Sequence, residues 1–397
     1  MSLSTADCFA ITAPGLESLT AAELTALGVI PSAVERGGVS WTGSVESVYR
    51  ANLHLRTASR VLVRVGSFRA RTFAELERYA KRLRWDAYIT RNRPIRFRVT
   101  CKKSRLYHTG AVVQRLATLL GPLVGDESLV GSVRGDDEHD FPDAQLFVVR
   151  IDHDEVIVSV DSSGALLHRR GYRQAVAKAP LRETLAAAMV LASGWDTHLP
   201  LIDPLCGSGT IAIEAALIAR RMAPGLERSF ACLRWPDANG ALWNTLLARA
   251  REEVLPRAPG MLRASDRDAG AVRAALENAE RAGVAADIDL AQHALSAIEP
   301  AGGRGWILAN PPYGVRVGDR DVRDLYAQLG HILRRNFAGW HFGLLSTYDN
   351  LIGQTRFCFE QSFKTSNGGI PVQFVTSVVP DMSDDPVRGP RGRGRRV

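Results

Sequence analysis

The sequence is poor in cysteine and has no long apolar run. Its five cysteines are scattered, without a Cys-x-x-Cys pair, which argues against a zinc site and a disulfide framework. No apolar run approaches the ~18 residues that a membrane-spanning helix needs, and residues 1–13 carry neither a basic nor an apolar leader segment. We therefore expect no bound metal and a reducing compartment, the cytoplasm.

The net charge of +8 is unevenly distributed along the chain. Residues 50–115 contain 18 Lys and Arg against 3 Asp and Glu, a net charge of +15, so the remaining residues sum to −7. Such a basic segment in an otherwise acidic chain indicates a partner that is a polyanion, above all nucleic acid. The alternative is an ordinary solvated face of helices and strands.

Composition and apolar patterns divide the chain into five parts. We expect a small α+β unit, a second α+β unit that carries most of the basic residues, a basic connector, a large α/β domain and a tail too poor in apolar residues to fold. In order, these parts are residues 1–58, 59–165, 166–185, 186–380 and 381–397. The candidate RNA contacts are Arg98 in the alternating strand 95–100, Lys102, Lys103 and Arg105 directly after that strand, and Arg169 and Arg170 in the basic connector.

The large domain alternates short apolar runs with helical segments, which predicts a doubly wound, mostly parallel sheet. An Asn-Gly pair at 367–368 lies between two further strand-like runs, 357–364 and 370–379, and this pair is a hairpin signal. The parallel sheet should therefore end in an antiparallel hairpin. Its predicted parallel strands are Leu199–Asp203, Met261–Ser265, Ile288–Ala291, Trp306–Ala309 and Phe342–Ser346.

A glycine-containing loop follows the first of these strands and leads into a helix. The glycines allow a tight turn and a close approach of the backbone to a ligand. The loop lacks the Gly-Lys-Ser/Thr of a phosphate-binding P-loop, and it lacks the third glycine of a dinucleotide site. A ligand without a pyrophosphate fits better, with an acidic side chain to hold a cationic amino group. The candidate residues are Asp203, Pro204, Cys206, Gly207, Ser208, Gly209 and Thr210.

Asp266, followed by Arg267, ends the second predicted strand. A carboxylate at this position can accept hydrogen bonds from both hydroxyl groups of a ribose. Asp266 could instead, or in addition, cap the helix that follows it. Residues 222–259 form an insertion between the glycine loop and this strand.

Asn310-Pro311-Pro312-Tyr313 follows the fourth predicted strand. The two prolines stiffen the loop and remove N–H donors. The Asn310 side-chain oxygen and the Pro311 carbonyl can then accept both N–H groups of an exocyclic base amine, which becomes nucleophilic when it pyramidalises. Tyr313 offers a flat face on which an extruded base can stack. The alternative is a plain Pro-Pro turn beside a core tyrosine.

The order of these features resembles the class I S-adenosylmethionine-dependent methyltransferases. More closely, the chain is similar to bacterial RNA guanine-N2 methyltransferases that carry N-terminal ferredoxin-like and THUMP domains and act on 23S ribosomal RNA or tRNA. The resemblance implies an α/β protein with a C-terminal Rossmann-like doubly wound sheet. Its marks are residues 14–17, 104–108, 168–173, 179–184, 203–210, 310–313, 364 and 367–368.

The resemblance also implies residue roles. Asp203, Gly207 and Gly209 would line the methionine end of the donor S-adenosyl-L-methionine, Asp266 would bind its ribose, and Asn310 to Tyr313 would hold the target base beside it. The family usually has Asp-Ala at the donor's adenine, whereas this chain has His293-Ala294. Asp289 or a backbone group is the alternative for that contact.

We therefore expect an enzyme that methylates N2 of a guanine, with 23S ribosomal RNA as the first candidate substrate and tRNA as the second. N6-adenine methylation is the alternative on the same fold. From another class, a non-catalytic RNA-binding or ribosome assembly factor is also considered, and a nicotinamide oxidoreductase is the most distant reading.

Overall fold

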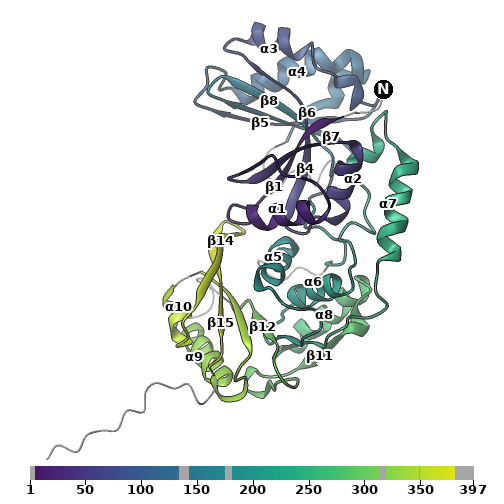
Figure 1. The fold of residues 1–397 in the computed structure, drawn as a ribbon. Helices are drawn as coiled ribbons and strands as arrows, with labels where there is room; N and C mark the ends of the chain where they lie inside the picture. The colour runs from purple at the N-terminus through teal and green to yellow at the C-terminus, as the bar shows by residue number, and fades with distance from the viewer. Residues whose placement is uncertain (1–4, 134–142, 175–180, 313–318, 348, 381–397) are drawn as a thin grey trace, which may run out of the picture. The chain divides into compact units, whose positions relative to one another are not determined.

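The computed structural model describes residues 5–133, 143–174, 181–312, 319–347 and 349–380. The chain divides into two units, each formed by two stretches of sequence (Figure 1). The N-terminal unit contains Met1–Arg173 and Arg221–Leu255, and the C-terminal unit contains Gln174–Arg220 and Pro256–Val397.

An eight-stranded sheet forms the frame of the N-terminal unit, with the strand order β2-β3-β1-β4-β8-β7-β5-β6. β4 is its longest strand and pairs with β1 on one side and β8 on the other. It therefore joins the first 58 residues and the following segment into one continuous sheet. The strands are β1 Ala6–Thr12, β2 Ala33–Glu35, β3 Gly38–Gly43, β4 Ala58–Arg69, β5 Ile95–Lys102, β6 Val130–Ser132, β7 Gln145–Asp152 and β8 Glu155–Asp161.

Alternation along these strands buries one side-chain set in an apolar core. Phe97 and Phe147 stack at 5.7 Å between ring centroids, and Trp85 meets the Phe147 ring at 5.1 Å. The helices that supply the rest of this core are α1 Glu17–Ala26, α2 Val45–His54, α3 Phe73–Ala80, α4 Thr109–Val124 and α7 Gly240–Glu252. α3 begins with a capping box between Thr72 and Glu75, the local signal that fixes a helix start.

Residues 221–255, which follow the glycine loop in sequence, belong to the N-terminal unit. The Trp235 ring lies 4.9 Å from that of Tyr88, and its Nε1–H donates to Oε1 of Gln145 at 2.9 Å. On α7, Trp243 packs edge-on against Tyr49 at 5.8 Å. The chain therefore leaves the C-terminal unit after α6, completes the core of the other unit, and returns before β10.

The C-terminal unit contains a seven-stranded sheet with the order β11-β10-β9-β12-β13-β15-β14. β9 to β13 are mutually parallel, and β15 and β14 add an antiparallel hairpin. This confirms the predicted doubly wound sheet and its terminal hairpin. The strands are β9 Leu201–Asp203, β10 Leu262–Asp266, β11 Ile288–Gln292, β12 Trp306–Ala309, β13 His341–Ser346, β14 Glu360–Asn367 and β15 Ile370–Val378.

One strand boundary differs clearly from the prediction. A strand was expected from Phe357, but β14 begins at Glu360. The rings of Phe357 and Phe359 instead pack at 6.0 and 5.7 Å from that of Phe342. Packing of these two half-buried rings against Phe342 of β13 therefore replaces extension of the strand.

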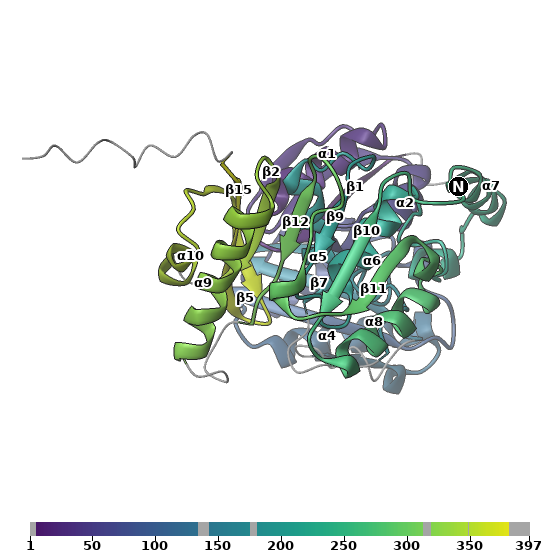
Figure 2. The ribbon, with the colours of Figure 1, turned by 90° about the horizontal axis from the view of Figure 1, so that it is seen from below.

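Helices flank this sheet, and its parallel strands lie side by side in Figure 2. They are α5 Glu183–Ser193, α6 Thr210–Ala219, α8 Ala269–Arg281, α9 Asp319–Asn336 and α10 Asp349–Gln354. Pro180, expected in the first turn of α5, lies outside the described residues, as does the tail 381–397. Within the described part of the chain, no helix is both long and apolar enough to cross a bilayer.

Candidate active site

The strand order of the C-terminal sheet reverses between β9 and β12, because β10 and β11 extend from one side of β9 while β12 and β13 extend from the other. Open α/β sheets bind ligands at such a switch point, outside the carboxyl ends of the strands. β9 and β12 are paired in parallel with Ile202 opposite Ile307. Asp203 and Asn310 therefore lie at the same edge of the sheet.

The glycine loop connects β9 to α6 and is held by its own backbone and by two neighbouring segments. The Gly209 N–H donates to the Cys206 carbonyl at 2.8 Å, and the Cys206 N–H donates to the Ser265 carbonyl at 3.0 Å. From α8, the Asn278 amide donates to the Ser208 carbonyl at 3.0 Å. The loop is thus fixed before any ligand binds.

Gly207 and Gly209 have positive φ angles, +52° and +82°, which favour glycine. A Cβ at Gly209 would lie 2.9 Å from the Cβ of Ala275, so the loop and α8 approach too closely for a side chain. A Cβ at Gly207 would meet no atom within 4 Å. The two glycines thus have different functions: Gly209 allows helix packing, and Gly207 leaves open space beside the loop.

Asp203 ends β9 and is buried, with 1% of its surface exposed. Its Oδ1 accepts a weak hydrogen bond from the Leu205 N–H at 3.3 Å, while its Oδ2 has no partner among the described residues. Burial raises the pKa of this carboxyl to about 8, and the nearby charge of Asp266 adds to the shift. Such a group can be satisfied by a cationic amino group.

Asp266 ends β10 and organises the loop beside it. Its Oδ2 accepts from the Gly207 N–H at 3.0 Å, and its Oδ1 accepts from the Asp268 N–H at 3.0 Å. The N-cap of α8 is Asp268, which accepts from the Gly270 N–H at 2.7 Å, so the alternative capping role considered for Asp266 is wrong. The half-buried carboxylate of Asp266 keeps further acceptor capacity at the strand end.

His293 and Ala294, expected near the donor's adenine, follow β11 and are both exposed. The His293 N–H donates to the Asp266 carbonyl at 3.0 Å, which ties the two strand ends together. Arg267 is also exposed, and its carbonyl accepts from the Gln292 amide at 3.2 Å. The alternative adenine partner, Asp289, forms an ion pair with Arg263 at 3.1 Å.

Asn310 follows β12, whose residues Trp306–Ala309 are buried. Its side-chain Oδ1 is buried and has no hydrogen-bond partner among the described residues. Pro311 is buried and Pro312 exposed, while Tyr313 lies outside the described residues. A buried oxygen without a partner is costly, so this amide is suited to accept an N–H from a bound molecule.

Asn278 was not among the predicted site residues. It is fully buried on α8, whose other buried residues are Ala275 and Ala279. A lone amide on the apolar face of an amphipathic helix was the available signal, because a buried amide needs a partner. Here that partner is the glycine loop.

The predicted RNA contacts differ in exposure. Lys102, Lys103, Arg105 and Arg169 are exposed and Arg98 is half-buried. Arg170, in contrast, is only 7% exposed, and its guanidinium donates to the carbonyls of Leu167 and Arg56, both at 2.6 Å. Arg170 therefore holds the connector against the N-terminal unit and is not available to RNA.

Several other cations of the 50–115 segment also serve the fold. Arg60 forms a buried ion pair with Asp161, and a guanidinium nitrogen of Arg96 donates to the Leu129 carbonyl at 2.9 Å. The number of basic residues in this segment therefore overstates the positive charge that is available to bind a polyanion. The remaining surface cations, not the total, define the candidate RNA-binding surface.

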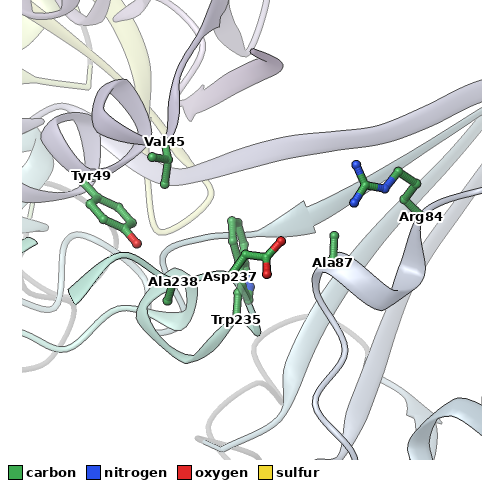
Figure 3. Close-up of a pocket in the computed structure, with 7 residues that line it drawn as sticks. All are labelled: Val45, Tyr49, Arg84, Ala87, Trp235, Asp237 and Ala238. Carbon is green, nitrogen blue, oxygen red and sulfur yellow. The ribbon is translucent and has the colours of Figure 1, made fainter. Parts of the chain in front are cut away.

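A pocket in the N-terminal unit was not expected from the sequence. It lies where α2, the turn after α3 and the 221–255 segment meet, and Figure 3 shows the Tyr49 hydroxyl and the Asp237 carboxylate among its walls. The Tyr49 hydroxyl accepts from the Asn239 N–H at 3.0 Å, and Trp235 closes one side. Its lining residues are Val45, Tyr49, Arg84, Ala87, Trp235, Asp237 and Ala238.

The sheet order, the glycine loop, the acidic residue after β10 and the Asn-Pro-Pro loop after β12 together define a class I methyltransferase fold. Comparison with known proteins gives the family. The chain belongs to the RMKL-like methyltransferase family, whose domain model matches residues 170–371. A second model, the RlmL ferredoxin-like domain, matches residues 7–62.

Curated relatives agree with this assignment. The chain is 34% identical over 374 residues to "Putative RNA methyltransferase slr0064" from Synechocystis, which covers 93% of this chain and 96% of the relative. It is 37% identical to a "Ribosomal RNA large subunit methyltransferase K/L" from Syntrophotalea carbinolica, covering 92% of this chain and 53% of the relative. This chain thus spans about half the length of the K/L relative.

Solved structures match nearly the whole chain. The crystal structure of SMU.472 complexed with SAH has a TM-score of 0.82 and 30% identity, and covers 94% of this chain and 98% of that one. A predicted N6-adenine-specific DNA methylase from Listeria monocytogenes has a TM-score of 0.79 and 32% identity, with 94% and 96% coverage. These findings confirm the predicted family and its methyl donor, S-adenosyl-L-methionine.

Proposed function

We propose that this protein transfers a methyl group from S-adenosylmethionine to N2 of a guanine in RNA, with 23S ribosomal RNA as the substrate. One observation supports this most directly. Asp203 Oδ2 and Asn310 Oδ1, at neighbouring strand ends, are both buried and have no partner among the described residues. One oxygen suits a cationic amino group and the other suits a base amine.

When bound, S-adenosylmethionine supplies a methyl group on a positively charged sulfur. Asp203 would hold the amino group of its methionine end, the Gly207–Gly209 backbone would lie along that end, and Asp266 would accept from the ribose hydroxyls. His293 and Ala294 remain the proposed neighbours of the adenine. The residues fit this group because the acidic side chains and the open space at Gly207 occur at the same sheet edge.

Asn310 and the Pro311 carbonyl would accept the two N–H groups of the target amine. Their pull favours the pyramidal amine, whose lone pair then attacks the methyl carbon. In that transfer the C–N bond would form as the C–S bond breaks with its electron pair left on sulfur, and the amine would lose its proton to water. A strong base is not required, because the proton becomes acidic only as the methyl group transfers. Tyr313 is proposed to stack the base.

For the RNA side, we propose that residues 59–165 act as a THUMP-type RNA-binding module. The exposed cations after β5, namely Lys102, Lys103 and Arg105, support this assignment. Together with Arg98 and Arg169, they would contact phosphates and position the RNA. The names of the K/L relatives favour ribosomal RNA, and tRNA remains the second candidate.

A second candidate function is N6-adenine methylation. It is favoured by the similarity to the Listeria monocytogenes protein, a predicted N6-adenine-specific DNA methylase. The Asn-Pro-Pro-Tyr chemistry serves both amines equally, because adenine N6 and guanine N2 are both conjugated with their ring. The modified nucleoside therefore distinguishes the two functions.

In the decisive experiment, the protein and isotopically labelled S-adenosylmethionine are incubated in separate reactions with unmodified 23S ribosomal RNA, with tRNA and with DNA. The product is digested and its labelled nucleoside identified by mass spectrometry. N2-methylguanosine in ribosomal RNA is the expected result, and N6-methyladenosine would transfer the assignment to the second candidate. Calorimetry that shows no binding of the donor would revive the alternative of a non-catalytic RNA-binding or ribosome assembly factor.

A further inference from the structure

An exposed aromatic pair in the N-terminal unit bears on how this unit would bind RNA. The segment between β5 and α4, residues 102–108, carries an exposed aromatic pair. Tyr107 is 67% exposed, and its ring centroid lies 4.1 Å from that of His108 at an interplanar angle of 39°. A large aromatic ring that stays in water is unusual, since such rings normally bury most of their surface.

The backbone of the 102–108 segment is fastened to the turn between β7 and β8. The Asp154 N–H donates to the Ser104 hydroxyl at 3.0 Å, the Arg105 N–H donates to Oδ1 of Asp154 at 2.8 Å, and the His153 N–H donates to the Lys102 carbonyl at 3.2 Å. Three hydrogen bonds therefore hold the loop that presents the ring. Such anchoring lowers the entropy that binding would cost.

The charges around this segment are unbalanced. Asp154 is paired with Arg71 at 3.1 Å, and Asp152 with Arg150 at 3.0 Å. Among the described residues, in contrast, no carboxylate forms an ion pair with Lys102, Lys103 or Arg105. Asp152 and Asp154 are thus paired within the protein, whereas these three cations are exposed.

We propose that the 102–108 segment binds an unpaired stretch of RNA, with Tyr107 and His108 stacking a nucleobase and Lys102, Lys103 and Arg105 contacting the flanking phosphates. The inference rests on the proposed RNA methyltransferase function and extends it to the form of RNA that is recognised. A flat ring beside several cations matches a base and its phosphates, because every base has a π-face and every link carries one negative charge. In a duplex the base faces are covered by neighbouring pairs, so the ring would gain nothing there.

The test compares three fluorescent RNA probes of equal length by anisotropy. The first is a single-stranded oligouridylate of ~10 nucleotides, within the range of single-strand site sizes. The second has the same backbone with abasic riboses at successive positions, and the third is a blunt duplex. The variants are Tyr107→Ala, Tyr107→Phe, which keeps the ring, and His108→Ala. Ile30→Ala is the matched control, because Ile30 is 84% exposed elsewhere on this unit.

Tyr107→Ala should weaken binding of the base-bearing strand roughly 5- to 100-fold, the effect expected for loss of one stacked base. Tyr107→Phe and Ile30→Ala should bind as the wild type does. On the abasic strand, Tyr107→Ala and the wild type should bind equally, because the partner of the ring is already missing. The salt dependence should be unchanged in Tyr107→Ala, since its phosphate contacts remain.

Two results would overturn the inference: equal binding of the base-bearing strand by wild type and Tyr107→Ala, or the same loss on base-bearing, abasic and duplex probes. The second result would mean that Tyr107 does not stack on a base and that its loss acts through a protein partner or a general charge effect. If Tyr107→Ala lowers the thermal midpoint of unfolding, the same three probes are compared with His108→Ala instead, because that variant also removes one ring of the pair. Methyl transfer is assayed in parallel: transfer without base discrimination refutes only this inference, and base discrimination without transfer refutes only the proposed enzymatic function.

Discussion

The backbone N–H of Gly207 donates a hydrogen bond to Oδ2 of Asp266 at 3.0 Å. The residue proposed to bind the donor's ribose therefore also fixes the loop proposed to bind its methionine end. These residues are 59 positions apart in the sequence, and residues 221–255 between them pack into the other unit. Two parts of the proposed donor site are thus coupled directly, whereas residues 221–255 between them pack into a different core.

The side-chain oxygen of Asn310 carries the first prediction. Asn310→Ala should reduce methyl transfer on the order of a hundredfold or more, the usual effect of deleting one oriented hydrogen-bonding group at a reacting centre. Donor affinity should change little, because the amide is proposed to face the base. Transfer is measured with labelled donor and affinity by calorimetry. Turnover at the wild-type rate would exclude this role.

The two loop glycines form a matched pair for the second prediction. Gly209→Ala should lower the free energy of unfolding by about 2–4 kcal/mol, since it adds a contact with Ala275 to the strain of a positive φ. Gly207→Ala has only the strain, about 1–2 kcal/mol. Its methyl group would occupy the space proposed for the donor, so donor affinity should fall roughly tenfold.

Denaturant unfolding and calorimetric titration of both variants separate these effects. The expected pattern is a larger stability loss for Gly209→Ala and, for Gly207→Ala, an affinity loss greater than its stability loss explains. If Gly207→Ala binds the donor normally, the donor does not lie beside this glycine.

Much of the C-terminal sheet could be predicted because its buried parallel strands are short apolar runs separated by helices. Trp306–Ala309 is such a run, and the structure reproduces it without a shift. The Asn367-Gly368 pair likewise predicted the hairpin between β14 and β15. The role of residues 221–255 could not be predicted, because packing of Trp235 on Tyr88 is a long-range contact with no local signal. The burial of Arg170 could not be predicted for the same reason, since one of its two carbonyl partners belongs to Arg56, which is distant in the sequence.

Burial of Asp203 gives the third prediction, a pH dependence. The pKa of its carboxyl is raised from 3.8 to about 8 in the folded protein, so the free protein holds a proton there at pH 7. The contribution of this group to folding is full below pH 3.8 and is lost as the pH rises through 8. Without donor, the free energy of unfolding of Asp203→Asn should therefore increasingly exceed that of the wild type as the pH rises from 3.8 to about 8. Thermal midpoints across this range measure the difference.

The fourth prediction concerns the same carboxyl when donor is present. A cationic amino group would favour the ionised form, so donor binding at pH 7 should release up to about one proton. Calorimetry in buffers with different ionisation enthalpies measures that release. It should vanish in Asp203→Asn, which should also bind the donor more weakly. Proton release that persists in this variant would assign the titration to another group.

The final prediction isolates the charge of the 102–108 segment from its aromatic pair. A single substitution, Lys102→Ala, Lys103→Ala or Arg105→Ala, should weaken RNA binding. It should also lower the slope of log K against log salt by about 0.7–0.9 if one phosphate contact is lost. Arg36→Ala is the matched control, because Arg36 is an exposed cation on the turn before β3. Since counterion release depends on phosphates and not on bases, the loss should occur with both probes, with a slope change of about 0.7 on a single strand and about 0.9 on a duplex. An unchanged slope in all three variants would place the RNA on another surface, and a loss restricted to single strands would mean that these side chains act on bases.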